Sequence, residues 1–152
     1  IEQALGWKQV IAEDLGYMTD SVRHLVYESC FPGMKVLEFA FDSRDSGCAS
    51  DYLPHNYPEN CVAYTGTHDN ETIVGPEEEL YKCFISLIMR SAARVCVIPM
   101  QDYMGLDNRF RMNKPSTVGT NWKWRIKKRD LTKKLQKEIY DVTLRYGRKN
   151  WD

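Results

Sequence analysis

Two short stretches of the sequence carry polar side chains directly after apolar or β-branched runs. Residues 64–70 (YTGTHDN) place an imidazole, a carboxylate and an amide side by side, and residues 10–16 (VIAEDLG) place two carboxylates before a turn glycine. Carboxyl and imidazole groups held at one point can move protons or stabilise developing charge. Catalytic groups at the ends of several strands are typical of an α/β barrel, so the two stretches predict a barrel active site.

The elements that would position these side chains alternate between short apolar runs and amphipathic stretches. Strands are predicted at residues 10–12, 34–41, 61–64 and 93–100. Helices are predicted from the N-cap Thr19 to near Cys30, around residues 80–88 and around residues 135–146. Their predicted apolar faces are Val22, Leu25 and Val26; Leu80, Phe84, Leu87 and Ile88; and Leu135, Ile139, Val142 and Tyr146. This alternation implies an α/β fold with a parallel sheet.

The charge balance of the chain argues against two large classes of partner. Among 152 residues, 21 basic and 21 acidic side chains cancel. We therefore expect no nucleic acid and no anionic membrane as a binding partner. No apolar run approaches the roughly 20 residues of a membrane helix, so neither a membrane span nor an export leader is expected.

The cysteines and histidines give little support for a metal site. The five cysteines are odd in number and lack a Cys-x-x-Cys spacing. This pattern favours buried thiols in a reducing compartment over a disulfide framework or a zinc site, and it predicts a cytoplasmic protein. The three histidines share no helical spacing, so we expect neither a metal nor another cofactor.

The first predicted strand lies close to the start of the sequence, with no predicted strand before it to pair with. A four-stranded parallel sheet would then have two free edges and one uncovered apolar face, which a closed barrel avoids. We therefore expect upstream residues that complete the sheet.

Five blocks of sequence, in order, resemble the 4-alpha-glucanotransferases of glycoside hydrolase family 77. The blocks are residues 11–16 (IAEDLG), 32–37 (PGMKVL), 52–57 (YLPHNY), 64–70 (YTGTHDN), and 111–113 (RMN) followed by 121–122 (NW). The family resembled has a (β/α)8 fold, the TIM barrel. The resemblance implies that residues 1–152 are the C-terminal half of such a barrel, with strands five to eight and the closing helix. The missing N-terminal half of the barrel would be its partner.

The resemblance also implies roles for individual residues. Glu13 matches the general acid/base, and Asp69 matches the carboxylate that holds substrate hydroxyls and stabilises the transition state. His68 and Asn113 match substrate-binding residues. The family's nucleophilic aspartate has no match, so the chain alone is expected to be inactive. The implied substrates are maltooligosaccharides and other alpha-1,4-glucans, transferred to an acceptor's 4-hydroxyl by a retaining double displacement.

Further features qualify this resemblance. Tyr52, Tyr57 and Trp122 are aromatic residues that could stack on sugars. Glu38 stands where the family commonly has glutamine, and the segment after Gly75 is shorter than is usual in the family.

Two alternatives stay open at this point. An alpha-glucan hydrolase or branching-type enzyme on the same barrel would share Glu13, His68 and Asp69 but should lack the blocks at residues 34–41 and 52–57. A non-catalytic oligosaccharide-binding or subunit fragment would instead complete its barrel with another chain. The mass of the purified protein separates this second case from a full enzyme, which should be several times heavier than 17.8 kDa.

Overall fold

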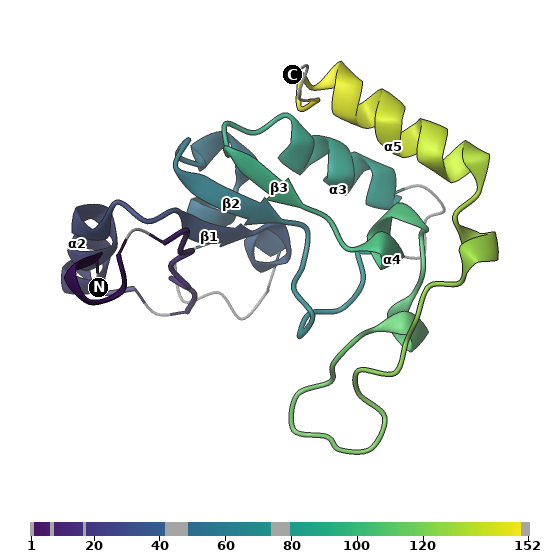
Figure 1. The fold of residues 1–152 in the computed structure, drawn as a ribbon, viewed down its shortest axis with the longest axis horizontal. Coiled ribbons are helices and arrows are strands. Elements are labelled where there is room, and N and C mark those ends of the chain that lie inside the picture. Colours follow the sequence, from purple (N-terminus) through teal and green to yellow (C-terminus); the bar gives the residue numbers. More distant parts are fainter. Residues whose placement is uncertain (1, 7, 17, 42–48, 74–79, 150–152) are drawn as a thin grey trace.

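A computed structural model of the chain describes residues 2–6, 8–16, 18–41, 49–73 and 80–149. Its centre is a parallel sheet of the order β1-β2-β3, shown in Figure 1. The strands are β1 (Gly33–Val36), β2 (Cys61–Tyr64) and β3 (Val95–Val97). In the register of the sheet, Val62 lies opposite both Met34 and Val95. The α/β fold with a parallel sheet is therefore confirmed.

Helices surround the sheet and connect its strands. The α-helices are α1 (Glu2–Leu5), α2 (Asp20–Ser29), α3 (Leu80–Met89), α4 (Met100–Tyr103) and α5 (Lys133–Arg145). Short 3₁₀ helices are η1 (Leu37–Phe41), η2 (Ala49–Tyr52), η3 (Pro54–Asn56), η4 (Asn108–Phe110) and η5 (Lys128–Asp130). Thr19 caps α2 by accepting a hydrogen bond from the Val22 N–H, as predicted, and Cys30 ends it in a left-handed conformation.

Of the four predicted strands, two are shorter in the structure and one forms only a single bridge. Residues 10–12 form only a single bridge, in which the Ala12 N–H donates to the Pro32 carbonyl. Residues 37–41 leave the sheet for η1, because Phe39 packs edge-on against the Tyr52 ring and Phe41 packs against a ring of α3. The last predicted strand ends at Val97, since Pro99 has no N–H to donate and begins the turn into α4.

The main core lies between the sheet and α3. It contains Leu37, Tyr57, Cys61, Ala63, Ile88 and Ala93, with Phe84, Leu87, Cys96 and Ile98 packed around it. Leu80 is exposed, so the predicted α3 face is wrong at that residue, and Ile85 and Met89 are buried instead. No residue of the predicted α2 face is buried: Val26 is half-buried, and Leu25 is 69% exposed. Helix α2 stands beside the β1 edge of the sheet rather than over it (Figure 1).

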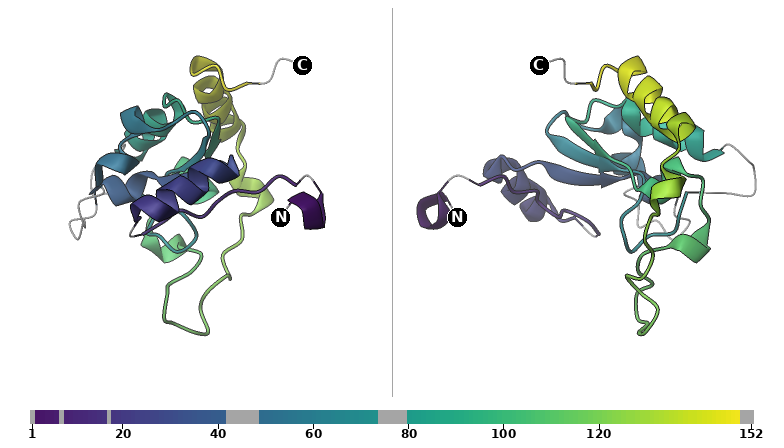
Figure 2. Two further views of the ribbon diagram at one scale, coloured as in Figure 1. Left: turned by 90° about the vertical axis from the view of Figure 1, so that its left-hand side faces the viewer. Right: turned by 45° about the vertical axis from the view of Figure 1, so that its right-hand side comes forward.

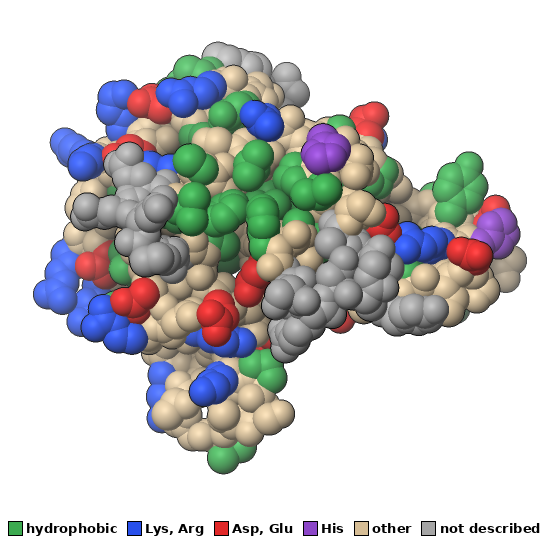
Figure 3. All heavy atoms as spheres, turned by 180° about the vertical axis from the view of Figure 1, so that it is seen from behind, with side chains coloured by type: hydrophobic (Ala, Val, Ile, Leu, Met, Phe, Trp, Pro, Cys, Tyr) green, Lys and Arg blue, Asp and Glu red, His purple; other side chains and the backbone are tan. Residues whose placement is uncertain are grey.

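Other apolar side chains are also exposed. Val95 and Val97 of β3 are more than 40% exposed, and so is Ile11. Hydrophobic side chains gather as well in the middle of the rear face of the molecule (Figure 3). The described residues thus leave part of the apolar surface uncovered.

The cysteine prediction is wrong for two residues. Cys61 is buried and Cys96 is half-buried, whereas Cys30 and Cys83 are exposed. Cys30 is exposed because it ends α2, which stands off the sheet, and Cys83 lies on the outer side of α3. The four are free thiols, and Cys48 lies outside the described residues.

Arg148 joins the segment after the C-terminal helix to the end of α3 and the segment that follows it. Helix α5 lies along α3 in the views of Figure 2, with Leu135 buried beneath it. Just beyond α5, the Arg148 guanidinium donates to three carbonyl oxygens that follow or end α3. These are Met89 O at 2.6 Å, Ser91 O at 2.9 Å and Ala93 O at 2.9 Å. These three hydrogen bonds hold the end of the described chain against the segment that leads into β3.

In the described part of the chain, no helix is both long enough and apolar enough to cross a bilayer.

Candidate active site

The loop after β2 is a tight turn built around Asn70. Its Oδ1 accepts hydrogen bonds from the Thr67 N–H at 2.9 Å and from the Thr67 hydroxyl at 2.7 Å. The Asn70 N–H in turn donates to the Thr67 carbonyl at 3.2 Å. The Asn70 side chain thus bonds back to Thr67, three residues earlier. The two residues between them, His68 and Asp69, point outward and are about half exposed.

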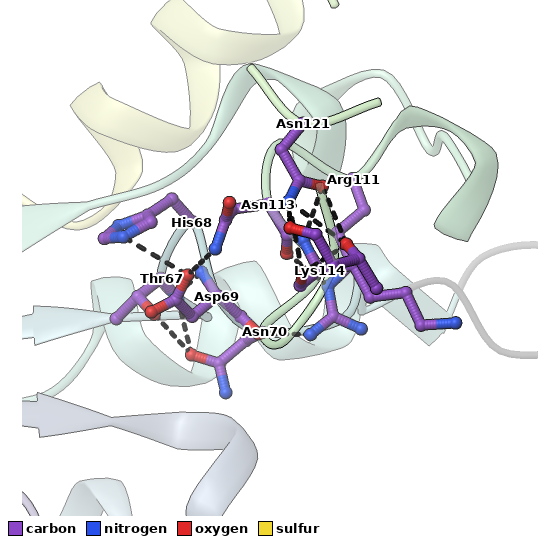
Figure 4. A network of polar contacts seen from close by, with 9 residues as sticks. Thr67, His68, Asp69, Asn70, Arg111, Asn113, Lys114 and Asn121 are labelled. Carbon is purple, nitrogen blue, oxygen red and sulfur yellow. Dashed lines mark hydrogen bonds and ion pairs between the residues drawn. The ribbon is translucent and has the colours of Figure 1, made fainter. Parts of the chain in front are cut away.

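Asp69 is oriented by two neighbours. The Asn113 side-chain amide donates to Asp69 Oδ1 at 2.6 Å, and His68 Nε2 lies 3.3 Å from the same oxygen (Figure 4). The Asn113 N–H also donates to the His68 carbonyl at 3.1 Å. Three of the four predicted site residues therefore lie in direct contact, although 44 positions separate Asp69 from Asn113.

Arg111 connects the loop after β2 with the segment that carries Asn113. It was not among the site residues predicted from the sequence. Its Nη2 donates to the Asp69 carbonyl, and its Nε donates to the Asn113 carbonyl at 2.8 Å. Its Nη1 lies 3.7 Å from Glu71, whose other oxygen accepts from Asn108 at 2.7 Å. The available signal was its place two residues before Asn113 in one of the matched blocks.

Trp122 is the aromatic residue that faces the site. Its ring lies against His68 with centroids 4.9 Å apart, and 51% of its surface is exposed. The backbone N–H of Trp122 donates to the Met112 carbonyl at 2.7 Å. The returning loop is held by Asn121, which bonds both the N–H and the carbonyl of Lys114. Figure 2 shows this loop extending away from the sheet.

The other two aromatic residues expected to stack on sugars are buried. Tyr52 and Tyr57 are 7% and 5% exposed. The Tyr57 hydroxyl donates to the Tyr52 carbonyl at 2.8 Å, and burial raises its pKa far above the usual range. That expectation is wrong for both tyrosines, because they close the core beneath η2 and offer no ring face to solvent.

Glu13 reaches the same region from the end of the Ala12 bridge. Its side chain is exposed, and it lines a cavity of about 470 Å³ together with His68 and Asp69. The next residue, Asp14, is anchored to β1. Its Oδ1 accepts from the Met34 N–H at 2.6 Å, and its Oδ2 lies 3.9 Å from the Lys35 ammonium. Asp14 thus fixes the backbone that carries Glu13.

A buried hydrogen-bonded pair, Thr65 and Asp102, joins the start of the loop after β2 to α4. The Thr65 hydroxyl donates to Asp102 Oδ2 at 2.5 Å, and the Ile73 N–H donates to Asp102 Oδ1 at 3.4 Å. Asp102 is only 2% exposed, and this burial raises the pKa of its carboxyl group. Because Thr65 directly follows β2, the pair ties the strand end to α4.

The predicted residues include no set of metal ligands. Within the ranges that the structure describes, no group of three or more His, Cys, Asp or Glu side chains is placed to hold a metal ion. The site instead combines carboxylates, amide and imidazole groups and an exposed indole. Such groups can bind sugar hydroxyls and an apolar sugar face.

A parallel sheet with these groups at its carboxyl edge defines the class of the protein, an α/β protein whose candidate ligand site lies beyond the carboxyl ends of the strands. Comparison with known sequences narrows the class to one family. The sequence model described as 4-alpha-glucanotransferase, glycoside hydrolase family 77, matches residues 1–76 and 75–132. The chain belongs to this family. The two matched segments meet at residues 75–76, where the sequence suggests a shortened connection, but that junction lies outside the described residues.

Individual relatives agree with this assignment. A 4-alpha-glucanotransferase of Clostridium butyricum is 41% identical over 169 residues, covering 97% of this chain and 34% of the relative. A potato (Solanum tuberosum) protein named 4-alpha-glucanotransferase, chloroplastic/amyloplastic, is 40% identical, covering 97% and 29%. The solved amylomaltase of Streptococcus agalactiae in complex with acarbose is 34% identical with a TM-score of 0.87, covering 98% and 34%. The chain spans about a third of the length of these relatives.

Proposed function

We propose that the polypeptide containing this chain is a 4-alpha-glucanotransferase. It would cleave an alpha-1,4 bond in a maltooligosaccharide or larger glucan and pass the segment to the 4-hydroxyl of an acceptor. The observation that carries the proposal is the shared cavity of Glu13, His68 and Asp69. Family membership and the acarbose complex of the Streptococcus agalactiae relative give it independent support.

In this proposal the two carboxylates have different tasks. Glu13 protonates the leaving glycosidic oxygen and then deprotonates the acceptor hydroxyl, as the acid/base of a retaining enzyme does. Asp69 binds sugar hydroxyls and stabilises positive charge at the anomeric carbon, while Asn113 and His68 hold its Oδ1 in place. Trp122 supplies a flat apolar face for a sugar ring. The nucleophilic carboxylate would come from a part of the polypeptide outside these residues.

We also propose that residues 1–152 are the C-terminal half of a (β/α)8 barrel. The TM-score of 0.87 with an amylomaltase and the parallel order β1-β2-β3 support this arrangement. The exposed residues Ile11, Val95 and Val97 would be covered by the N-terminal half of the barrel. A cytoplasmic location remains a prediction from cysteine usage, and the potato relative is named for a plastid instead.

The test is made on the longest natural polypeptide that contains these residues, called below the intact polypeptide. Glu13→Gln should lower maltotriose disproportionation by at least about 10³-fold with an unchanged unfolding midpoint, because the amide cannot donate a proton. Glu59→Gln is the matched control, since Glu59 is exposed and its ion pair with Arg94 is long at 3.9 Å. Retained disproportionation in Glu13→Gln would contradict the assignment.

The same assay separates the alternatives. Transfer leaves the number of reducing ends unchanged, whereas a hydrolase raises it with every bond cleaved. A binding subunit would retain maltotriose in a dialysis experiment and produce neither glucose nor longer products.

A further inference from the structure

Glu38 is a half-buried acidic residue that the proposed mechanism does not use. It lies in the first turn of η1, directly after the carboxyl end of β1. Its Oε2 is buried and has no hydrogen-bond partner among the described residues. A Cβ atom built on Gly66 would lie only 3.1 Å from this oxygen. The carboxyl group of Glu38 therefore lies close to the backbone of Gly66, two residues before His68.

Charged groups from three segments face Glu38. Glu71 comes from the end of the β2 loop, Asp102 from α4, and Arg111 from the segment after η4. Burial raises the pKa of Glu38 to about 7, and the charges of Glu71 and Asp102 also raise it. A hydrogen bond from the Glu71 backbone and the charge of Arg111 act in the opposite direction without outweighing the burial.

Arg111 connects Glu38 to the proposed site. This arginine pairs with Glu71 at 3.7 Å and donates to the backbone carbonyls of Asp69 and Asn113. While Glu38 is neutral, Glu71 is the carboxylate that pairs with Arg111. When Glu38 ionises, its charge repels Glu71, attracts Arg111 and leaves a buried anionic oxygen without a donor. Each of these effects acts on the loop of residues 66–71, whose arrangement sets the position of Asp69.

We propose that Glu38 is a positioning residue that holds the loop of residues 66–71 in its substrate-binding arrangement only while its carboxyl group is protonated. This inference rests on the proposed glucan transfer at the same site. A group whose neutral form is favoured in the folded protein stabilises that arrangement at low pH and loses the effect as the pH rises through its folded pKa. Transfer should therefore decline on the alkaline side of neutrality.

The test compares the pH dependence of maltotriose transfer in the intact polypeptide with that in its Glu38→Gln variant. Glutamine has nearly the same shape and cannot ionise. The parent kcat/KM should fall by up to about tenfold for each pH unit above 7. Glu38→Gln should keep the activity found at pH 6 and decline less steeply than the parent, while Glu59→Gln should follow the parent profile. An alkaline decline unchanged in Glu38→Gln would overturn the proposal.

A second measurement does not depend on activity. Hydrogen–deuterium exchange of the peptide covering residues 64–73 is compared at pH 6 and pH 8.5, after correction for the intrinsic rates. The parent should lose at least about tenfold of its protection at the higher pH, and Glu38→Gln should not. Equal losses in both proteins would overturn the role of Glu38. An absence of transfer at every pH would instead refute the proposed function, and the exchange experiment would still decide the role of Glu38.

Discussion

The contact between Gly33 and Asp14 gives the sharpest mutational test of how Glu13 is positioned. A Cβ added at Gly33 would lie 2.7 Å from Asp14 Oδ2 and 3.0 Å from its Oδ1 and Cγ. Gly33→Ala must therefore push the carboxylate aside. That movement breaks its hydrogen bond with the Met34 N–H, which is 2.6 Å long, and its pairing with Lys35.

The expected cost follows from these contacts. A hydrogen bond to a charged group contributes about 1.5–3 kcal/mol, and the Asp14 side chain is only 10% exposed, so solvent replaces the bond poorly. Alanine offsets about 0.5–1 kcal/mol through its smaller conformational entropy in the unfolded chain. We expect Gly33→Ala to lower the free energy of unfolding by about 1.5 kcal/mol and to reduce transfer, because Asp14 follows Glu13 directly.

A double-mutant cycle separates this clash from other causes. Urea unfolding of the intact polypeptide is measured for Gly33→Ala, Asp14→Ala and the pair. In the Asp14→Ala background nothing remains to clash, so Gly33→Ala should be neutral or stabilising by up to about 1 kcal/mol. A Gly33→Ala cost that is equal in both backgrounds would refute the reasoning.

Three further substitutions test side-chain hydrogen bonds that hold the site and the C-terminal segment in place. Arg148→Lys should lower the free energy of unfolding by about 2 kcal/mol, because a single ammonium cannot reach all three carbonyls of the guanidinium fork; an unchanged urea midpoint would contradict this. Thr65→Val should cost about 1–3 kcal/mol by removing the donor to a buried carboxylate, whereas the matched Thr143→Val, whose hydroxyl bonds only within α5, should cost less than about 0.5 kcal/mol. Asn113→Ala should reduce kcat/KM about tenfold with little effect on unfolding, because Asp69 loses its 2.6 Å donor; unchanged kinetics would show that Asn113 does not orient Asp69.

The parts of the fold that could be predicted depend on local patterns. The strand at residues 61–64 and the capped helix α2 appear as predicted, because a short apolar run and an N-cap threonine act through neighbouring residues. The strand predicted at residues 34–41 stops at Val36. Its remaining apolar side chains pack against rings from distant segments, and hydrophobicity alone does not distinguish this packing from a longer strand.

Part of the candidate site could also be predicted from the sequence. His68 and Asp69 follow a clear strand, and their contact with Asn113 agrees with the residues expected to gather there. Arg111 was not selected, because its contact with Asp69 joins segments more than 40 residues apart and has no local signal. Trp122 was one of three aromatic candidates, and its contact with His68 appears only in three dimensions. Glu38 stood out only as a residue unusual for its position, and its burial beside Gly66 appears only in three dimensions.

The most direct test of the central claim is the product pattern from maltotriose. The intact polypeptide is incubated with maltotriose, and glucose, longer maltooligosaccharides and total reducing ends are followed together. The proposed transfer predicts glucose and longer products with a constant number of reducing ends, all abolished by Glu13→Gln. Reducing ends that rise with each bond cleaved, or products that persist in Glu13→Gln, would contradict the account.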